Sequence, residues 1–299
     1  MSTSLEKAIH WVYRSRKYFS PFYADNDAMG AKMFSELQLT LFLLNVNRHK
    51  LSDKAISEVE KLSELSYEII SSPKYYELIF SCLSFFRLYG AGAIYYLGYA
   101  YDEVLFKTVE KATPFVRYNI KELQNYSRMD LEHLLMMFDS YVDGKVKYDS
   151  TQLLQNSIID SDLDIAFYSR LDEYSLTHSI FYVTDFGNNN IPVAVYKRIV
   201  YILQTMAYKN YFMNDLDLLG EYIMCLCFMH CGNGCLKELY AGLVSCQNRD
   251  GSYSGPSRDG LRKNSKGLKG LYKRQKKIVL DNYHTTLVAI MAMVLYKED

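Results

Sequence analysis

The sequence predicts an all-α protein, and three observations support this prediction. Apolar residues such as Leu5, Ile9 and Val12 recur at spacings of three and four, which is the period of an amphipathic helix. Strand-like alternation of apolar and polar residues is rare along the chain. The 299 residues include only 5 prolines and 15 glycines, which is too few for a turn-rich β fold.

Breaks in this periodicity divide the chain into twelve expected helices. Turn-forming runs at residues 45–47, 71–73 and 187–190 end helices, and the glycine pair at 90–92 interrupts another. The expected helices cover residues 4–18, 30–47, 52–71, 76–90, 100–124, 129–141, 151–165, 173–186, 192–209, 216–232, 235–247 and 281–297.

Every second helix in this series is more apolar than its neighbours. Residues 218–229 are apolar on all sides, as in a buried helix, whereas residues 57–62 carry charges on one face. The apolar helices start at intervals that suit helical hairpin repeats. We therefore expect residues 1–299 to form a single α/α toroid of about six hairpins around a central cavity. An open solenoid or an irregular bundle is the alternative.

Composition excludes several classes of protein. The 34 Lys and Arg residues balance 34 Asp and Glu, which argues against a general nucleic-acid-binding protein. No uncharged apolar run reaches 18 residues, so we expect no membrane span. Residues 1–17 lack the apolar core of a signal peptide. Five of the six cysteines fall within residues 225–246, on expected helices, which favours free thiols in a reducing cytoplasm over a disulfide framework.

Two histidines point to a shared site. His178 and His284 lie near the starts of two expected inner helices, so in a ring of parallel inner helices they would meet at one rim. His230 lies at the end of its helix and belongs to the opposite rim. Glu221, in the first turns of the helix between them, lies on the same rim as His178 and His284. These three residues form the candidate catalytic cluster.

The residue types in this cluster allow two kinds of chemistry. Two imidazoles and a carboxylate are a known ligand set for divalent metals, and Cys225 follows Glu221 by one helical turn. The candidate metal ligands are therefore His178, Glu221, Cys225 and His284, with zinc as the possible cofactor. The same histidines could instead act as a metal-free acid–base pair, or simply help to build helix starts.

Asp185 and the later cysteines are weaker candidates. Asp185 lies two turns beyond His178, about 10 Å deeper along the helix. It could orient a ring histidine, bind a cation in the interior, or cap the helix end. Cys227, Cys231 and Cys235 recur every four residues, but glycines break the helix before the third of them. A zinc site there is less favoured than buried free thiols.

Residues 248–280 differ in composition from the rest of the chain. Between residues 258 and 277 there are nine Lys or Arg residues and one Asp, and glycines recur throughout. We expect a flexible basic loop that overhangs the rim bearing His284. It would attract a diphosphate, a nucleotide or an acidic peptide, or else be a solvated insertion.

Two segments carry a resemblance to known toroids. Residues 247–253, Gln-Asn-Arg-Asp-Gly-Ser-Tyr, resemble the Gln-x-x-Asp-Gly-Ser-Trp turn of terpenoid cyclases. Residues 281–287, Asp-Asn-Tyr-His-Thr-Thr-Leu, resemble the segment that opens the last inner helix of protein prenyltransferase β subunits. The resemblance implies an α/α toroid in which His284 ligates zinc, and this role carries over to His284 alone. Tyr283, the residue before it, is a further candidate catalytic residue. The Asp and Cys ligands of that family, two residues apart, have no clean match.

Residues 176–187 are similar to the signature of an uncharacterised bacterial helical family. The resemblance implies a bacterial cytoplasmic protein, and we expect it to act in specialised metabolism. The leading expectation is a transferase-like or cyclase-like enzyme that acts on a peptide or an isoprenoid-like small molecule. Its candidate catalytic residues are His178, Glu221, His284, Asp185 and Tyr283. A non-catalytic protein that holds an apolar ligand, and a scaffold for a partner enzyme, are the alternatives.

Overall fold

The structure is a computed structural model, and it describes residues 3–23, 28–123, 125–143, 150–155, 157–161, 164–231, 234–256 and 271–297. Its helices are α1 (Ser4–Ser15), α2 (Ala28–Val46), α3 (Asp53–Ile70), α4 (Pro73–Ser81), α5 (Leu83–Phe85), α6 (Ala91–Leu97), α7 (Glu103–Asn119), α8 (Asn125–Asp143), α9 (Ser150–Gln155), α10 (Arg170–Val183), α11 (Val193–Phe212), α12 (Leu216–Phe228), α13 (Gly234–Ser245) and α14 (Leu271–Leu295). Within these ranges there is no strand, so the expected all-α class is confirmed.

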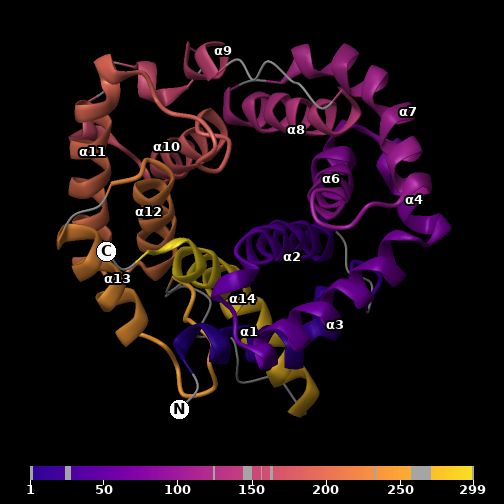
Figure 1. The fold of residues 1–299 in the computed structure, drawn as a ribbon, viewed down its shortest axis with the longest axis horizontal. Helices are drawn as coiled ribbons and strands as arrows, with labels where there is room; N and C mark the ends of the chain where they lie inside the picture. Colours follow the sequence, from indigo (N-terminus) through magenta and orange to yellow (C-terminus); the bar gives the residue numbers. More distant parts are fainter. Residues whose placement is uncertain are drawn as a thin grey trace.

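The helices form two layers around a common centre (Figure 1). Helices α2, α6, α8, α10, α12 and α14 lie inside, and the remaining long helices surround them. Each inner helix contacts the next one along the chain, and α14 also contacts α2, so the last inner helix closes onto the first. The alternation of apolar and amphipathic segments anticipated this layering. Its identity with the toroid of the terpenoid cyclases stays a prediction.

The difference in apolar character follows from this position. In α12 every residue from Leu216 to Leu226 is buried, because the helix is covered by α10 and α14 within the inner layer and by α11 from outside. In the outer helix α3 only one face is buried, through residues such as Val59, Leu62 and Ile69. A helix with neighbours on every side must be apolar all round, whereas an outer helix keeps a solvated face.

One inner helix differs from the expectation. Residues 76–90 were expected to be a single inner helix ended by Gly90 and Gly92, but α4 lies in the outer layer and a π-helical turn, Phe86–Gly90, leads directly into the inner helix α6. A Cβ atom on Gly92 would lie 2.9 Å from the Tyr75 hydroxyl and 3.6 Å from the Cα of Ser35 on α2. The glycine therefore allows close packing of α6 on α2 rather than ending a helix.

Two other expected segments also differ. The expected helix 151–165 is short: α9 ends at Gln155, and two 3-10 turns, Ile158–Asp160 and Ile165–Phe167, follow. The expected loop 248–280 is in part folded, because residues 271–280 form the first turns of α14. The range 257–270 lies outside the described residues.

The turn at residues 247–253 is packed against two helices. Tyr253 is fully buried, and its backbone N–H donates a hydrogen bond to Oγ1 of Thr286 at 2.9 Å. Nε2 of Gln247 donates to the backbone carbonyl of Ser4 at 2.8 Å. The segment that resembles the terpenoid cyclase turn is thus packed between α1 and α14. The expected flexibility of residues 248–280 stays a prediction.

Residues Gln275–Leu295 of α14 are long and apolar enough to cross a membrane by length and composition, and 67% of this stretch is buried inside the fold. Its apolar side chains pack against α12, α2 and α1. The packing explains the apolar composition and is consistent with the expected lack of a membrane span. All six cysteines are free, as expected for a chain without a disulfide framework.

Candidate functional site

The starts of α10 and α12 are held side by side by capping groups. Ser169 and Asp172 form a reciprocal capping box at the start of α10, and the Asp215 carboxylate caps α12 by accepting from the N–H of Leu218. Arg170 joins the two helix starts through a salt bridge with Asp215. The first turns of α10 and α12 therefore lie next to each other.

Three of the residues expected to share a rim are brought together there. Nε2 of His178 and Nε2 of His284 each lie 3.8 Å from the same oxygen atom, Oε1 of Glu221. The Glu221 side chain is only 3% exposed, whereas the His178 and His284 side chains are 26% and 29% exposed. The two imidazoles thus lie between a buried carboxylate and solvent.

Two further carboxylates complete this group, and the sequence analysis did not select them as site residues. Oε2 of Glu36, on α2, lies 3.0 Å from Nδ1 of His284, and Oδ1 of Asp217 lies 3.5 Å from Nε2 of the same ring. Glu36 is one of only two charged residues in α2, the other being Lys32. A carboxylate in such an apolar helix was the available signal. We call His178, Asp217, Glu221, His284 and Glu36 the rim cluster.

The carboxylates hold His284 in its charged form. Burial by itself would lower the pKa of His284, but the negative charges of Glu36 and Asp217, the hydrogen bond to Glu36 and the charge of Glu221 raise it to about 10. Burial opposes ionisation of Glu36 and Glu221 as well, yet the pKa of each is lowered, in Glu36 by His284 and in Glu221 mainly by His178. At neutral pH His284 is therefore an imidazolium ion among carboxylates.

Hydroxyl groups fix the two carboxylates of α12. The Thr177 hydroxyl donates to Oε2 of Glu221 at 2.5 Å, which leaves Oε1 facing the two imidazoles. The Tyr174 hydroxyl donates to Oδ2 of Asp217 at 2.6 Å, and Oγ1 of Thr285 donates to its other oxygen at 3.2 Å. Burial raises the pKa of Asp217. These contacts preorganise the carboxylates before any ligand is bound.

Two expected site residues have other surroundings. The Cys225 thiol donates to the backbone carbonyl of Thr177 at 3.6 Å, and burial raises its pKa far above the usual value. These surroundings favour the neutral thiol form of Cys225, and its role as a metal ligand stays a prediction. The Tyr283 hydroxyl lies 3.6 Å from Sδ of Met29, and its ring packs edge-on against Phe19. Tyr283 anchors α14 in the core beside His284.

Asp185 lies in a second polar group, apart from the rim cluster. Oδ1 of Asp185 is 3.1 Å from Nε2 of the fully buried His133, and Oδ2 accepts from the Asn188 side chain at 3.2 Å. Of the three roles considered for Asp185, the contacts match two, orientation of a ring histidine and a helix-end contact, and binding of an interior cation stays a prediction. Burial opposes ionisation of Asp185, but the hydrogen bond to His133 lowers the pKa of this carboxyl. Nearby, the Tyr182 hydroxyl donates to Asp130 at 2.9 Å.

In the described ranges, the His, Cys, Asp and Glu side chains as they stand are not gathered in threes at metal-ligand spacing. The thiols near the end of α12 also favour the neutral form, since burial raises the pKa of Cys227 to about 12 and raises that of Cys231. Zinc at the rim cluster stays a prediction.

A separate pocket of about 350 Å³ lies beyond the end of α10, next to the start of α11. It is lined by Asn189, Asn190, Ile191, Val193, Tyr196, Phe228 and Met229. None of the expected site residues lines it.

Comparison with known proteins identifies a family but does not indicate an activity. No curated protein and no solved structure matches the chain. One family model matches residues 5–294, which is nearly the whole chain. The protein therefore belongs to the family described as a domain of unknown function, DUF6895.

Proposed function

We propose that the protein is an enzyme whose active site is the rim cluster, and that it performs metal-free acid–base chemistry. The observation that carries the proposal is the shared position of His178 and His284, each 3.8 Å from the same buried oxygen of Glu221. Structural histidines do not need to converge on one carboxylate. A histidine beside a carboxylate that can orient it meets a geometric criterion for a general acid–base site.

The two histidines have different tasks in this proposal. His284 carries its proton at neutral pH because its pKa is raised to about 10, so it acts as a fixed positive charge that stabilises negative charge on the substrate. Its Nδ1 is engaged by Glu36. His178 is the group that accepts a proton from the reacting atom at Nε2 and returns it later. Glu221 stabilises the charge that then forms on His178.

The proposed substrate is a peptide or an isoprenoid-like small molecule, and the reaction is a transferase-like or cyclase-like one in bacterial specialised metabolism. The apolar side chains beneath the rim cluster support a substrate with a substantial apolar part. Six free cysteines support a reducing compartment, and we propose the cytoplasm.

Untargeted mass spectrometry tests this proposal on complex mixtures, so that the substrate need not be identified in advance. Wild-type protein, His178→Gln and Glu221→Gln are incubated with bacterial small-molecule and peptide extracts. We expect the wild type to consume and form specific masses that both variants leave unchanged. Glu60→Gln, at an exposed site on the outer helix α3, is the matched control and should behave like the wild type. A wild type without any effect, or variants that convert the same masses, would reject the proposal.

Zinc chemistry is the second candidate, and one contact favours it. Glu36 engages Nδ1 of His284, so Nε2 faces the interior, as in zinc sites where a carboxylate orients the ligating histidine. His178, His284 and Glu221 would be the ligands, and the metal would activate a water, thiol or hydroxyl. Elemental analysis of untagged wild type and His284→Ala tests this candidate. One zinc per chain that is lost in the variant would support it, and metal-free wild type would reject it.

A binding or scaffold protein is the third candidate. Phe167, Leu171, Phe212 and Met213 are all more than 70% exposed, and they lie around the start of α10 and the end of α11. A contiguous exposed apolar patch is typical of a docking site, and these four side chains are the candidates for one. This candidate predicts that the His178 and Glu221 variants keep ligand or partner binding, and that no extract mass is converted.

A further inference from the structure

We propose that the outer helix α7 is a self-association surface, on which a second copy of this chain packs its own α7 in the antiparallel direction. The inference goes beyond the proposed function and does not depend on the rim cluster. It follows from exposed apolar side chains on α7, from their heptad spacing and from the distribution of charge along the same helix.

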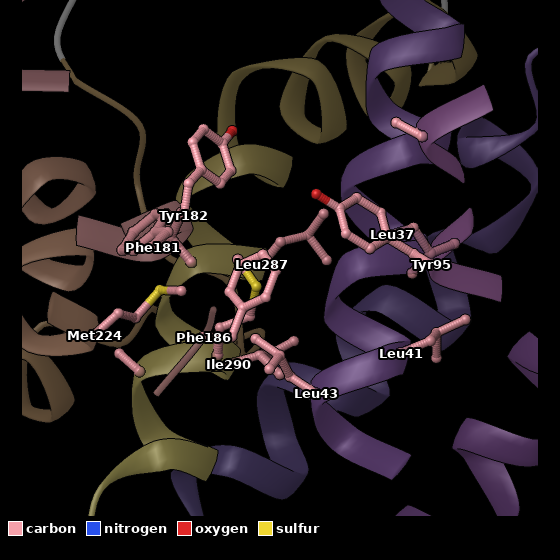
Figure 2. Close-up of a cluster of buried hydrophobic side chains, with 14 of the residues drawn as sticks. Leu37, Leu41, Leu43, Tyr95, Phe181, Tyr182, Phe186, Met224, Leu287 and Ile290 are labelled. Atoms are coloured by element: carbon pink, nitrogen blue, oxygen red, sulfur yellow. The ribbon is translucent and has the colours of Figure 1, made fainter. Parts of the chain in front are cut away.

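Large apolar side chains on α7 are exposed although the helix has a buried face of its own. Val104, Phe115 and Tyr118 are between 47% and 81% exposed, whereas the opposite face of α7 packs on α4 and α6. The centre of the ring takes its apolar side chains from other helices: the labelled ones in Figure 2 come from α2, α6, α12, α14 and from α10 with the turn after it. The exposed side chains of α7 are therefore not part of that core, and together they are typical of a docking surface.

The exposed side chains have the spacing of a coiled-coil seam. Successive members of the series are separated by four, three, four and three residues: Val104, Thr108, Lys111, Phe115 and Tyr118. Positions spaced in this way form a narrow stripe along one side of a helix, and two such stripes pack against each other in a helix pair. We call these five residues the α7 stripe.

Pro114 does not divide the α7 stripe. A proline has no N–H, so the backbone carbonyl of Glu110 lacks its usual helical partner. The Thr113 hydroxyl donates to that carbonyl at 2.9 Å, and α7 continues to Asn119. Residues on both sides of the proline therefore belong to one helix.

The charges along α7 indicate which occupant fits the stripe. Residues 102–110 contain three acidic residues and one basic residue, whereas residues 111–121 contain three basic residues and no acidic one. Two parallel copies of α7 would place like charges side by side. Two antiparallel copies place the acidic start of each helix beside the basic end of the other, which is favourable at both ends. The helix is thus complementary to itself, as a symmetric dimer requires.

An antiparallel pair also aligns the side chains of the stripe. With Thr108 opposite the partner's Lys111, Val104 lies opposite the partner's Phe115, and Glu103 lies beside the partner's Arg117. A polar pair in the middle of a seam fixes the register and lowers the stability of the pair. We expect one helix pair to bury less than about 1,200 Å², which corresponds to a weak dimer.

Sedimentation velocity of the full-length protein, from about 1 to about 500 μM, tests the inference. We expect a monomer–dimer equilibrium with a dissociation constant on the order of 10–100 μM. Monomer at every concentration would overturn the inference, and a partner of another sequence would then be the occupant to seek.

A first pair of variants tests whether the α7 stripe is the interface. Tyr118→Asp changes a side chain that is 81% exposed, so the fold should tolerate it, and the symmetric dimer would receive two buried charges. We expect the dissociation constant to rise by about 100-fold or more. Phe212→Asp is the matched control, because Phe212 is 79% exposed at the end of α11, on the other side of the ring (Figure 1). A dimer that Tyr118→Asp leaves intact, or that Phe212→Asp abolishes, would overturn the inference.

A second pair of variants tests the antiparallel arrangement. Glu103→Arg places an arginine beside the partner's Arg117 and should raise the dissociation constant by about tenfold. Glu60→Arg is the matched control on α3, since each substitution removes an exposed glutamate from a surface salt bridge, with Lys107 or with Arg48. Glu60→Arg should dimerise like the wild type. Dimerisation of Glu103→Arg at the wild-type dissociation constant would overturn the antiparallel arrangement.

Discussion

Glu36 and His284 come from the first and the last inner helix, and Oε2 of Glu36 lies 3.0 Å from Nδ1 of His284. Because Asp217 and Glu221 lie on the other side of the same imidazole, a single charged ring connects α2, α14 and α12 at the point where the helical ring closes. The contacts of α14 with α2 and α12, which close the ring of inner helices, therefore also bring Glu36, Asp217 and Glu221 next to His284.

The first prediction concerns stability at alkaline pH. The pKa of His284 is raised from 6.5 to about 10, so the folded state holds a proton that the unfolded chain loses above pH 6.5. The stability that this proton provides is complete below about pH 6.5 and is lost as the pH rises toward 10. We expect wild type to lose on the order of 3 kcal/mol more than His284→Gln over this range. Urea denaturation at a series of pH values measures the difference, and parallel curves would contradict it.

The second prediction assigns the source of that shift. Glu36→Gln removes the negative charge beside Nδ1 of His284 but keeps the shape of the side chain. The pKa of His284 should fall by about 1–2 units, as expected for loss of an adjacent opposite charge. An NMR titration of the His284 ring resonances measures it. Glu60→Gln is the control. An unchanged pKa of His284 in Glu36→Gln would show that Glu36 does not cause the raised pKa.

The third prediction tests the second polar group. Asp185→Ala leaves the buried His133 without this partner and places alanine at a φ of 45°, where a side chain is strained. We expect a loss of about 1–3 kcal/mol in the free energy of unfolding. Asp185→Asn should lose less, because asparagine tolerates this backbone conformation and retains an acceptor for His133. Thermal and urea denaturation compare the two variants, and equal losses would contradict the argument.

The fourth prediction concerns the turn that packs on α1. Gly251 has a φ of 96°, and a Cβ atom there would lie 2.3 Å from the backbone oxygen of Lys7. Gly251→Ala should therefore lower the free energy of unfolding by about 2–4 kcal/mol. Gly234→Ala is the matched control, since nothing lies within 4 Å of the added methyl group and we expect a change within about 0.5 kcal/mol. Similar stability in the two variants would show that the turn is not tightly packed.

Helix content and layer assignment were largely predictable from the chain. The composition of the segment 216–228 is apolar on all sides, which predicts the burial of α12. The charged face of α3 predicts which side of that helix faces solvent. The exception in layer assignment is the segment before α6, where Gly90 and Gly92 were interpreted as a break. Glycine ends helices and also permits close packing between them, and only the neighbouring helix α2 distinguishes these two uses.

The rim cluster was predictable in part. His178, Glu221 and His284 were expected to meet because each was placed near the start of its predicted helix. They do meet, although His178 lies in the second half of α10 and His284 lies in the middle of α14, which begins at Leu271 rather than near residue 281. Asp185 was harder to interpret, because its partner His133 lies 52 residues away on α8.

Periodicity along the chain determined the class of the fold and the alternation of its layers, because burial of a helix face depends on residues three and four positions apart. Tertiary structure alone decided that Glu36 meets His284 across 248 residues, that Cys225 points to a backbone carbonyl, and that His284 is held as a cation. Those properties depend on which helices are in contact where the ring closes and on the charges that are buried at that contact. The spacing of residues along the chain predicts neither of these.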